Sequence, residues 1–167
     1  MRHACPMTDE HSAGPPASLS MTVLMTPDMS NFAGSVHGGA LLKLLDQVAY
    51  ACASRYAASY VVTLSVDRVL FYEPIRVGEL VSFSASINYT GRTSMEVGIR
   101  VDAQDIRTGT SRHANSCYFT MVAVDDSGKP RAIPPLVPGN DLARKRFEAA
   151  RQRRSASQQS SKGTSVY

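Results

Sequence analysis

The feature that most constrains this chain is one long helical segment, residues 40–58. Its residues are nearly all good helix formers, and most of them are apolar. Five of its polar side chains fall at positions i, i+3, i+4, i+7 and i+11 and so form one narrow stripe: Lys43, Asp46, Gln47, Tyr50 and Ser54. A helix that is apolar on most of its circumference must be covered on most of its sides, and a curved antiparallel sheet can do this.

Strand-like alternation of apolar and polar residues marks five further segments: residues 19–25, 61–71, 80–89, 95–103 and 114–124. The short connection 90–93 predicts a hairpin between the third and fourth segments. Near Asp67 and Arg68 the alternation changes phase, which indicates a bulge or an edge strand.

The order of segments predicts an α+β fold. One long central helix is wrapped by a curved antiparallel sheet of about five strands, in the order strand, helix, then four strands. Such a sheet has edge strands, and edge strands commonly pair with a second subunit.

The chain has 167 residues, a length typical of one domain. Residues 1–17 and the last dozen are rich in Ser, Gly, Pro or Gln and lack periodicity, so both are predicted to be disordered. We divide the chain into an N-terminal tail (1–17), a folded domain (18–135) and a basic C-terminal helix with a disordered tail (136–167). Asn140 and Asp141 are positioned to cap a short helix that ends at Arg154.

Composition excludes several classes of protein. A hydrophobic content of 43% argues against a wholly disordered or fibrous chain. The longest apolar run, residues 48–53, is far too short to cross a bilayer, and residues 1–20 lack the apolar core of a signal peptide. We therefore expect a cytoplasmic protein. The cysteines (three) and histidines (four) have neither disulfide-framework nor metal-site spacing, so no metal is expected.

The net charge of +4 is unevenly distributed. Residues 1–140 contain 11 Lys and Arg against 12 Asp and Glu, whereas residues 141–167 contain 7 against 2. The body is close to neutral and the basicity belongs to the C-terminal tail. A nucleic-acid partner is not expected, although an acidic partner of the tail stays open as an alternative.

The segment 34–39 is rich in glycine and stands directly before the long helix. Its glycines allow backbone N–H groups to approach an oxyanion at the positive end of the helix dipole, but a simple tight turn fits the same pattern. His37 fits a general base or a side chain hydrogen-bonded at the turn, and we assign it no catalytic role. Asp46 on the polar stripe faces either water or a cleft at a subunit seam, where it would be a candidate base.

The segment 31–46 resembles the signature of hotdog-fold acyl-CoA thioesterases. The order and spacing of its key residues match that signature: Asn31, Gly34, His37-Gly38-Gly39 and Asp46. Further stretches resemble the acyl-CoA hydrolase branch of that superfamily: residues 66–79, 91–97, 119–125 and 128–130. The likeness covers about residues 18–135 and implies a hotdog fold.

This resemblance implies a site for thioester hydrolysis, which requires an activated water and a donor for the carbonyl oxygen. Asp46 corresponds to the catalytic carboxylate, acting as general base or as nucleophile through an anhydride. Asn31 corresponds to the catalytic asparagine, whose amide orients water or substrate. The Gly39 N–H corresponds to the oxyanion donor, with the Gly38 N–H as a candidate second donor. In the family the asparagine and the aspartate come from opposite protomers of a dimer.

The resemblance also assigns Arg92, Thr93 and Ser94 to a loop that approaches the phosphates of coenzyme A, although an ordinary polar turn fits the pattern as well. No cofactor is required, because coenzyme A is part of substrate and product. Relatives often assemble three dimers into a hexamer. We therefore expect self-association as a dimer, extended to a trimer of dimers.

The leading hypothesis is an acyl-CoA thioesterase. Within the fold, an arylacetyl-CoA thioesterase is the closest alternative, and residues 92–97 and 119–125 favour the acyl-CoA hydrolase branch. A hotdog hydratase uses a histidine and a carboxylate in a different arrangement. His37 does not lie in the motif of such a hydratase, so this alternative is disfavoured. A non-catalytic acyl-CoA sensor whose basic tail contacts nucleic acid or an acidic partner belongs to another class. Thiol release from acyl-CoA separates the enzyme from the sensor.

Overall fold

The computed structural model describes residues 14–163. Its elements are β1 (Ser18–Leu24), a 3-10 turn η1 (Pro27–Met29), α1 (Gly38–Ala57), β2 (Tyr60–Phe71), β3 (Glu79–Thr90), β4 (Ser94–Asp105), β5 (Ser111–Val124) and α2 (Asp141–Gly163). The predicted order of one strand, one long helix and four strands is confirmed. The predicted α+β class is confirmed with it.

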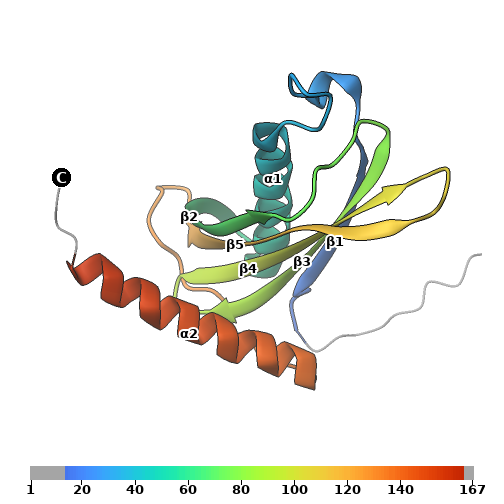
Figure 1. Cartoon of the computed structure of the whole chain (residues 1–167). Helices are drawn as coiled ribbons and strands as arrows, with labels where there is room; N and C mark the ends of the chain where they lie inside the picture. Colours follow the sequence, from blue (N-terminus) through green and yellow to red (C-terminus); the bar gives the residue numbers. More distant parts are fainter. Residues whose placement is uncertain (1–13, 164–167) are drawn as a thin grey trace, which may run out of the picture.

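The five strands form one antiparallel sheet in the order β1-β3-β4-β5-β2, which curves around α1 (Figure 1). β3 and β4 form the predicted hairpin. β2 is an edge strand, and its pairing with β5 shifts register between Thr63 and Ser65 and again between Asp67 and Leu70. The phase change near Asp67 therefore reflects both a bulge in β2 and the position of β2 at the edge of the sheet.

The core lies between α1 and the concave face of the sheet. Alternate residues of β3, β4 and β5 are buried against the inner face of the helix. The buried residues of α1 are Leu41, Leu45, Val48, Ala49, Cys52, Ala53, Tyr56 and Ala57. Burying a Leu or Val side chain contributes about 1.5–3 kcal/mol, so this packing dominates the stability of the fold.

The outer face of α1 carries the predicted stripe. Lys43, Asp46, Gln47 and Tyr50 are exposed in the single chain. Ser54 departs from the pattern, because it is half-buried and its Oγ has no hydrogen-bond partner within residues 14–163. The stripe is therefore open to ligands or to another chain over its first two turns and closes toward the C-terminal end of the helix.

The second helix is longer than predicted. Asn140 caps it as expected, since its Oδ1 accepts a hydrogen bond from the Ala143 N–H at 2.8 Å. The helix does not end at Arg154, as predicted, but continues to Gly163 in the structure. No proline interrupts this stretch, and its Ser, Gln and Ala residues are compatible with a helix once the preceding turns are docked. Residues 1–13 and 164–167 of the predicted tails lie outside the described residues.

α2 packs on the face of the sheet opposite to α1 (Figure 1). Its side chains contact Ser86 and Glu96, which alternate with strand residues that point at α1. Ala150 on the inner side of α2 is fully buried. The sheet is therefore covered by a helix on each face. None of the helices in the described part of the chain is long and apolar enough to cross a membrane.

A buried ion pair fixes the connection between β2 and β3. Arg112 on β5 donates two hydrogen bonds to the Glu79 carboxylate, at 2.6 and 2.9 Å, and the Arg76 N–H donates a third at 2.8 Å. Arg112 also bonds the Pro74 carbonyl and pairs with Glu73. These contacts hold the pKa of Glu79 below its ordinary value, chiefly through the hydrogen bonds from Arg112.

Replacing Glu79 by Gln is expected to lower the free energy of unfolding by about 1–3 kcal/mol at neutral pH, because hydrogen bonds to a charged group are lost. The lowered pKa means that the stabilisation by the carboxylate is fully present above its unfolded-state pKa and is lost as the pH falls through the folded-state value. Urea unfolding at fixed protein concentration should therefore show a difference between wild type and variant that shrinks below about pH 4. Glu73→Gln, at a more exposed carboxylate, is the control. A difference independent of pH would contradict this account.

Candidate functional site

Asp46 lies at the rim of a shallow cavity between α1 and the edge strand β2. The Thr63 hydroxyl donates a hydrogen bond of 2.7 Å to Asp46 Oδ1. The cavity has a volume of about 330 Å³ and is lined by Asp46, Gln47, Tyr50, Tyr60, Val61, Val62 and Thr63. One carboxylate oxygen is thus held in place by a strand, and no partner of the other, Oδ2, is present in the described part of the chain.

Thr63 was not among the site residues predicted from the sequence. It is 17 residues from Asp46 along the chain, and the first register shift of β2 follows directly after it. Its Oγ also lies 3.6 Å from Met121 Sδ on the neighbouring strand. The phase change near Asp67 was the only irregularity visible in the sequence, so nothing marked this threonine as different from any other strand residue.

Asn31 lies in the loop between η1 and α1, in a second cavity. Its side-chain Oδ1 accepts hydrogen bonds from the backbone N–H groups of Ala33, at 2.9 Å, and Ser35, at 3.1 Å. These bonds fix the amide plane and leave Nδ2 as a donor without a partner among the described residues. The cavity has a volume of about 380 Å³ and is lined by Asn31, Ser35, Val36, Gly38, Leu41, Phe71, Tyr72, Glu73, Pro74 and Ile75.

Asp46 and Asn31 are not brought together within one chain. They line different cavities, and Asp46 stands eight residues beyond Gly38, which is roughly 12 Å along a helix. Within one chain, the two side chains therefore do not share a cavity.

The N-terminus of α1 is capped by His37. Its Nδ1 accepts a hydrogen bond of 2.8 Å from the Gly39 N–H, so the interpretation of His37 as a side chain hydrogen-bonded at the turn is confirmed. A Cβ at position 39 would lie 3.0 Å from this nitrogen, which explains the glycine there. The predicted oxyanion donor is thus already engaged, and the imidazole must turn away before Gly39 can bind a substrate oxygen. The Gly38 N–H has no partner in the part of the chain that the structure describes.

The turn between β3 and β4 is braced by the backbone. The Thr93 carbonyl accepts a hydrogen bond from the Ala123 N–H at 2.9 Å, and the Arg92 carbonyl accepts one from the Ile133 N–H at 3.0 Å. The Gly91 N–H closes the turn itself. Arg92 is exposed and Thr93 is half-buried. Such a turn presents its side chains from a fixed backbone.

Ser94 at the end of this turn is 8% exposed, and its hydroxyl accepts a hydrogen bond from Arg154 on α2. Sequence analysis did not connect these two residues. Elsewhere in residues 14–163, no group of three or more His, Cys, Asp or Glu side chains could hold a metal ion. Cys52 and Cys117 are buried free thiols, and burial raises the pKa of Cys52 to about 11, so neither is a reactive thiolate near neutral pH.

Comparison with known proteins identifies the family. A model of the thioesterase superfamily matches residues 33–110. The protein VdlD of Helicobacter pylori is 52% identical over 136 residues, which is 81% of this chain and 78% of VdlD. The cytosolic acyl coenzyme A thioester hydrolase of Mus musculus is 36% identical over 80% of this chain, although the match spans only 36% of that protein.

Solved structures agree with these relatives. The crystal structure of an apo-hexameric acyl-CoA thioesterase superposes with a TM-score of 0.84 at 34% identity, covering 87% of this chain and 94% of that one. The chain belongs to the acyl-CoA thioester hydrolases of the thioesterase superfamily. This finding confirms the expected family and the hotdog fold.

This chain is also similar to an acyl-CoA hydrolase of Staphylococcus aureus, solved in complex with butyryl coenzyme A and coenzyme A. The match has a TM-score of 0.80 at 31% identity and covers 89% of this chain and 92% of that one. Variants of that enzyme in which an asparagine, an aspartate or a threonine is replaced by alanine have also been solved.

Replacing His37 by Ala removes the helix cap and is expected to lower stability by about 1 kcal/mol, or the Tm by about 2–4 °C. His37→Asn should recover most of this loss, because asparagine is a strong capping residue. Thermal unfolding of the three proteins at one concentration measures the effect. Equal Tm values for the two variants would show that the imidazole does not act as a cap.

Proposed function

We propose that this chain hydrolyses acyl-CoA to a free carboxylic acid and coenzyme A, with Asp46 assisting the attack of water. The observation that carries the proposal is the Asp46 carboxylate, held by Thr63 at a cavity on the exposed face of a helix whose opposite face is buried. Membership of the acyl-CoA thioester hydrolases sets the substrate class.

The spacing of three residues supports transfer of the site from the Staphylococcus aureus enzyme. The asparagine, aspartate and threonine replaced in its variants are separated by 15 and 17 residues. Asn31, Asp46 and Thr63 have the same two separations in this chain. The three side chains that the structure places around the two cavities therefore correspond to three side chains chosen for substitution in a relative.

In the proposed reaction, Asp46 accepts a proton from a water molecule as the water oxygen attacks the thioester carbonyl carbon. The tetrahedral intermediate then collapses, the C–S bond breaks, and the leaving thiolate of coenzyme A takes up a proton. Thr63 orients the carboxylate through Oδ1 so that Oδ2 is directed to the water. Direct attack by the carboxylate through an anhydride would give the same products, and labelled water in a single turnover distinguishes the two routes.

The negative charge that develops on the carbonyl oxygen requires donors, and the N-terminus of α1 can supply them. Gly38 lines the same cavity as Asn31, and its N–H is unengaged within the described residues. The Gly39 N–H joins it once His37 releases its hydrogen bond. The oxyanion donors and Asn31 thus belong to one half of the site, and Asp46 with Thr63 belongs to the other half.

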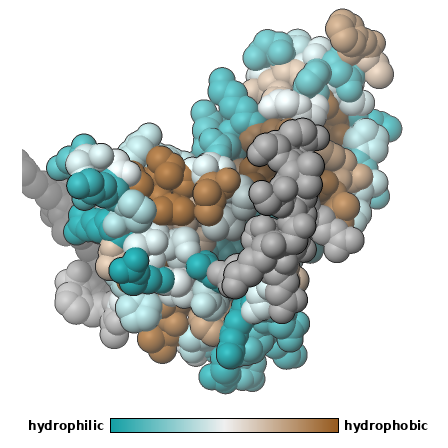
Figure 2. Space-filling view, turned by 90° about the vertical axis from the view of Figure 1, so that its left-hand side faces the viewer, coloured by the Kyte–Doolittle hydropathy of each residue, from teal (hydrophilic) through white to brown (hydrophobic). Residues whose placement is uncertain are grey.

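The edge strand β2 offers a way to join these halves. Exposed apolar and aromatic side chains follow this strand: Tyr60, Val62, Leu64, Val66, Leu70 and Phe71. Figure 2 looks onto the side of the molecule where β2 forms the edge and shows hydrophobic areas there among polar ones. An unpaired strand with exposed apolar side chains is a surface that a second chain would cover.

Two copies of β2 paired antiparallel about a two-fold axis would complete the site. Thr63 lines the Asp46 cavity and Phe71 lines the Asn31 cavity. With the axis midway between Thr63 and Phe71, the Asp46 cavity of one protomer faces the Asn31 cavity of its partner. Three such dimers would form a hexamer, and the similar acyl-CoA thioesterase described above is hexameric. We place the enzyme in the cytoplasm, as for the cytosolic relative of Mus musculus.

The phosphates of coenzyme A are assigned to the turn formed by Arg92, Thr93 and Ser94. A guanidinium and hydroxyl groups presented from a braced backbone suit phosphate oxygens. No cofactor beyond the coenzyme A of the substrate is proposed. Acyl-CoA binding without any turnover would instead favour the non-catalytic sensor.

Asp46→Asn keeps the size of the side chain and removes the base, so kcat should fall by about 10²–10⁴-fold while the fold is retained. Thiol release from acyl-CoA esters of several chain lengths, followed with a thiol-reactive chromogenic reagent, measures the effect. Asp126→Asn, at an exposed carboxylate outside both cavities, is the matched control. Near-normal turnover by Asp46→Asn would exclude the assignment of the base.

A further inference from the structure

The basic helix α2 has no role in the proposed hydrolysis, yet its arginines are not equivalent. Three of them pair with carboxylates: Arg144 with Asp141, Arg151 with Glu148, and Arg153 with Glu96. Arg154 is half-buried and has no carboxylate partner in the described part of the chain. Its guanidinium carbon lies 5.5 Å from the centre of the Tyr89 ring, a cation–π contact that leaves the charge without a carboxylate partner.

Arg153 docks the helix on the sheet. Its guanidinium donates to both oxygens of Glu96, at 2.7 and 3.1 Å, and lies 3.8 Å above the centre of the Tyr118 ring. Glu96 also accepts a hydrogen bond from Asn88. A bidentate, partly buried pair of this kind fixes the rotation of α2, and with it the direction in which the next residue points.

Arg154 is thereby aimed at the turn between β3 and β4. Its Nη1 donates a hydrogen bond of 2.9 Å to Ser94 Oγ. Its guanidinium also lies against the backbone of Gly91, where a Cβ would be 3.1 Å from Nη2. The absence of a side chain at position 91 therefore allows the guanidinium to lie close to the backbone of the turn. A guanidinium has five N–H donors, so one bond to Ser94 leaves others for a ligand.

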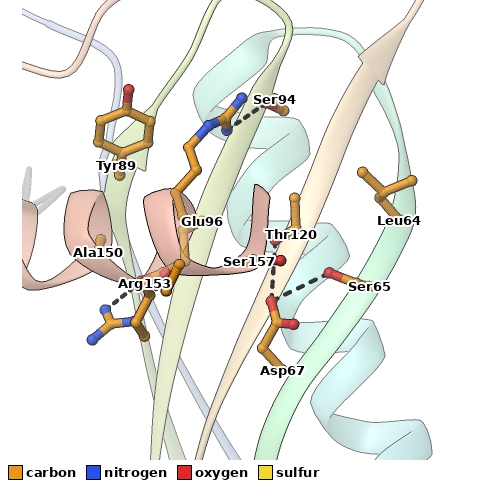
Figure 3. Close-up of a pocket in the computed structure, with 12 residues that line it drawn as sticks. Leu64, Ser65, Asp67, Tyr89, Ser94, Glu96, Thr120, Ala150, Arg153 and Ser157 are labelled. Atoms are coloured by element: carbon orange, nitrogen blue, oxygen red, sulfur yellow. Dashed lines mark hydrogen bonds and ion pairs between the residues drawn. The ribbon is translucent and has the colours of Figure 1, made fainter. Parts of the chain in front are cut away.

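A cavity of about 410 Å³ lies beside these groups, between α2 and the outer face of the sheet. Figure 3 shows Ser94 at one end of the labelled side chains and Asp67 at the other. Asp67 accepts hydrogen bonds from Ser65 and Thr120, and the nearby Glu96 is paired with Arg153. The end of the cavity at Ser94 therefore has Arg154 as its uncompensated charge, which favours an anion there.

We propose that Arg154 is a specificity-determining residue that acts with Arg92, Thr93 and Ser94 to bind the phosphate groups at the nucleotide end of the substrate. This inference rests on the proposed function for the identity of the ligand. The anion site is built from two segments 60 residues apart, a braced hairpin turn and a docked helix. Its cation is held in place before the ligand arrives, so little conformational entropy is lost on binding.

The test compares acyl-CoA with the corresponding acyl-pantetheine, which has the thioester but lacks the nucleotide. Arg154→Ala should raise KM for acyl-CoA about tenfold with little change in kcat, because a remote phosphate contact contributes ground-state binding. KM for acyl-pantetheine should not change. Arg154→Lys should recover part of the affinity, and Arg151→Ala, which removes a surface cation of the same helix, is the matched control.

Two results would overturn the inference: an equal rise of KM for both thioesters, which indicates loss of helix packing alone, or no rise for acyl-CoA. Calorimetric titration of the wild type and Arg154→Ala with adenosine 3′,5′-bisphosphate provides a readout that needs no turnover. About tenfold weaker binding to the variant supports the site even if the chain proves not to hydrolyse thioesters. An unchanged Kd contradicts it.

Discussion

The burial of α1 by the curved sheet is the constraint on which the rest of the structure depends. Eight of its residues are buried against the sheet, and its exposed polar face borders the edge strand β2. Asp46 stands there with Thr63 beside it, and the apolar side chains of β2 extend the same surface.

The groups proposed for catalysis lie in two separate cavities of one chain. The proposed base Asp46 and the hydroxyl of Thr63 lie between α1 and β2, whereas the amide of Asn31 and the N–H of Gly38 lie at the N-terminus of α1. Within a single chain the two halves of the proposed site therefore line different cavities. Exposed apolar residues on the open edge between them give a physical reason for the halves to meet across a dimer.

Much of the fold could be predicted from the sequence, because period-2 and helical patterns are local. Contacts that depend on the tertiary arrangement could not be predicted. Thr63 contacts Asp46 across 17 residues because the edge strand β2 lies beside α1, and the Gly39 N–H is engaged because His37 caps the helix. The polar composition of residues 155–163 suggested disorder, yet α2 continues through them, beyond the turns that Arg153 and Ala150 dock on the sheet.

The most direct test of the account is to mix two inactive proteins, Asp46→Asn and Asn31→Ala, under conditions that allow subunits to exchange. A site shared between protomers is rebuilt once in each mixed dimer, so turnover of acyl-CoA should return to about a quarter of the wild-type value. Each variant alone should stay inactive after the same treatment. No recovery, despite mixed dimers detected by native mass spectrometry, would contradict a site composed of two chains.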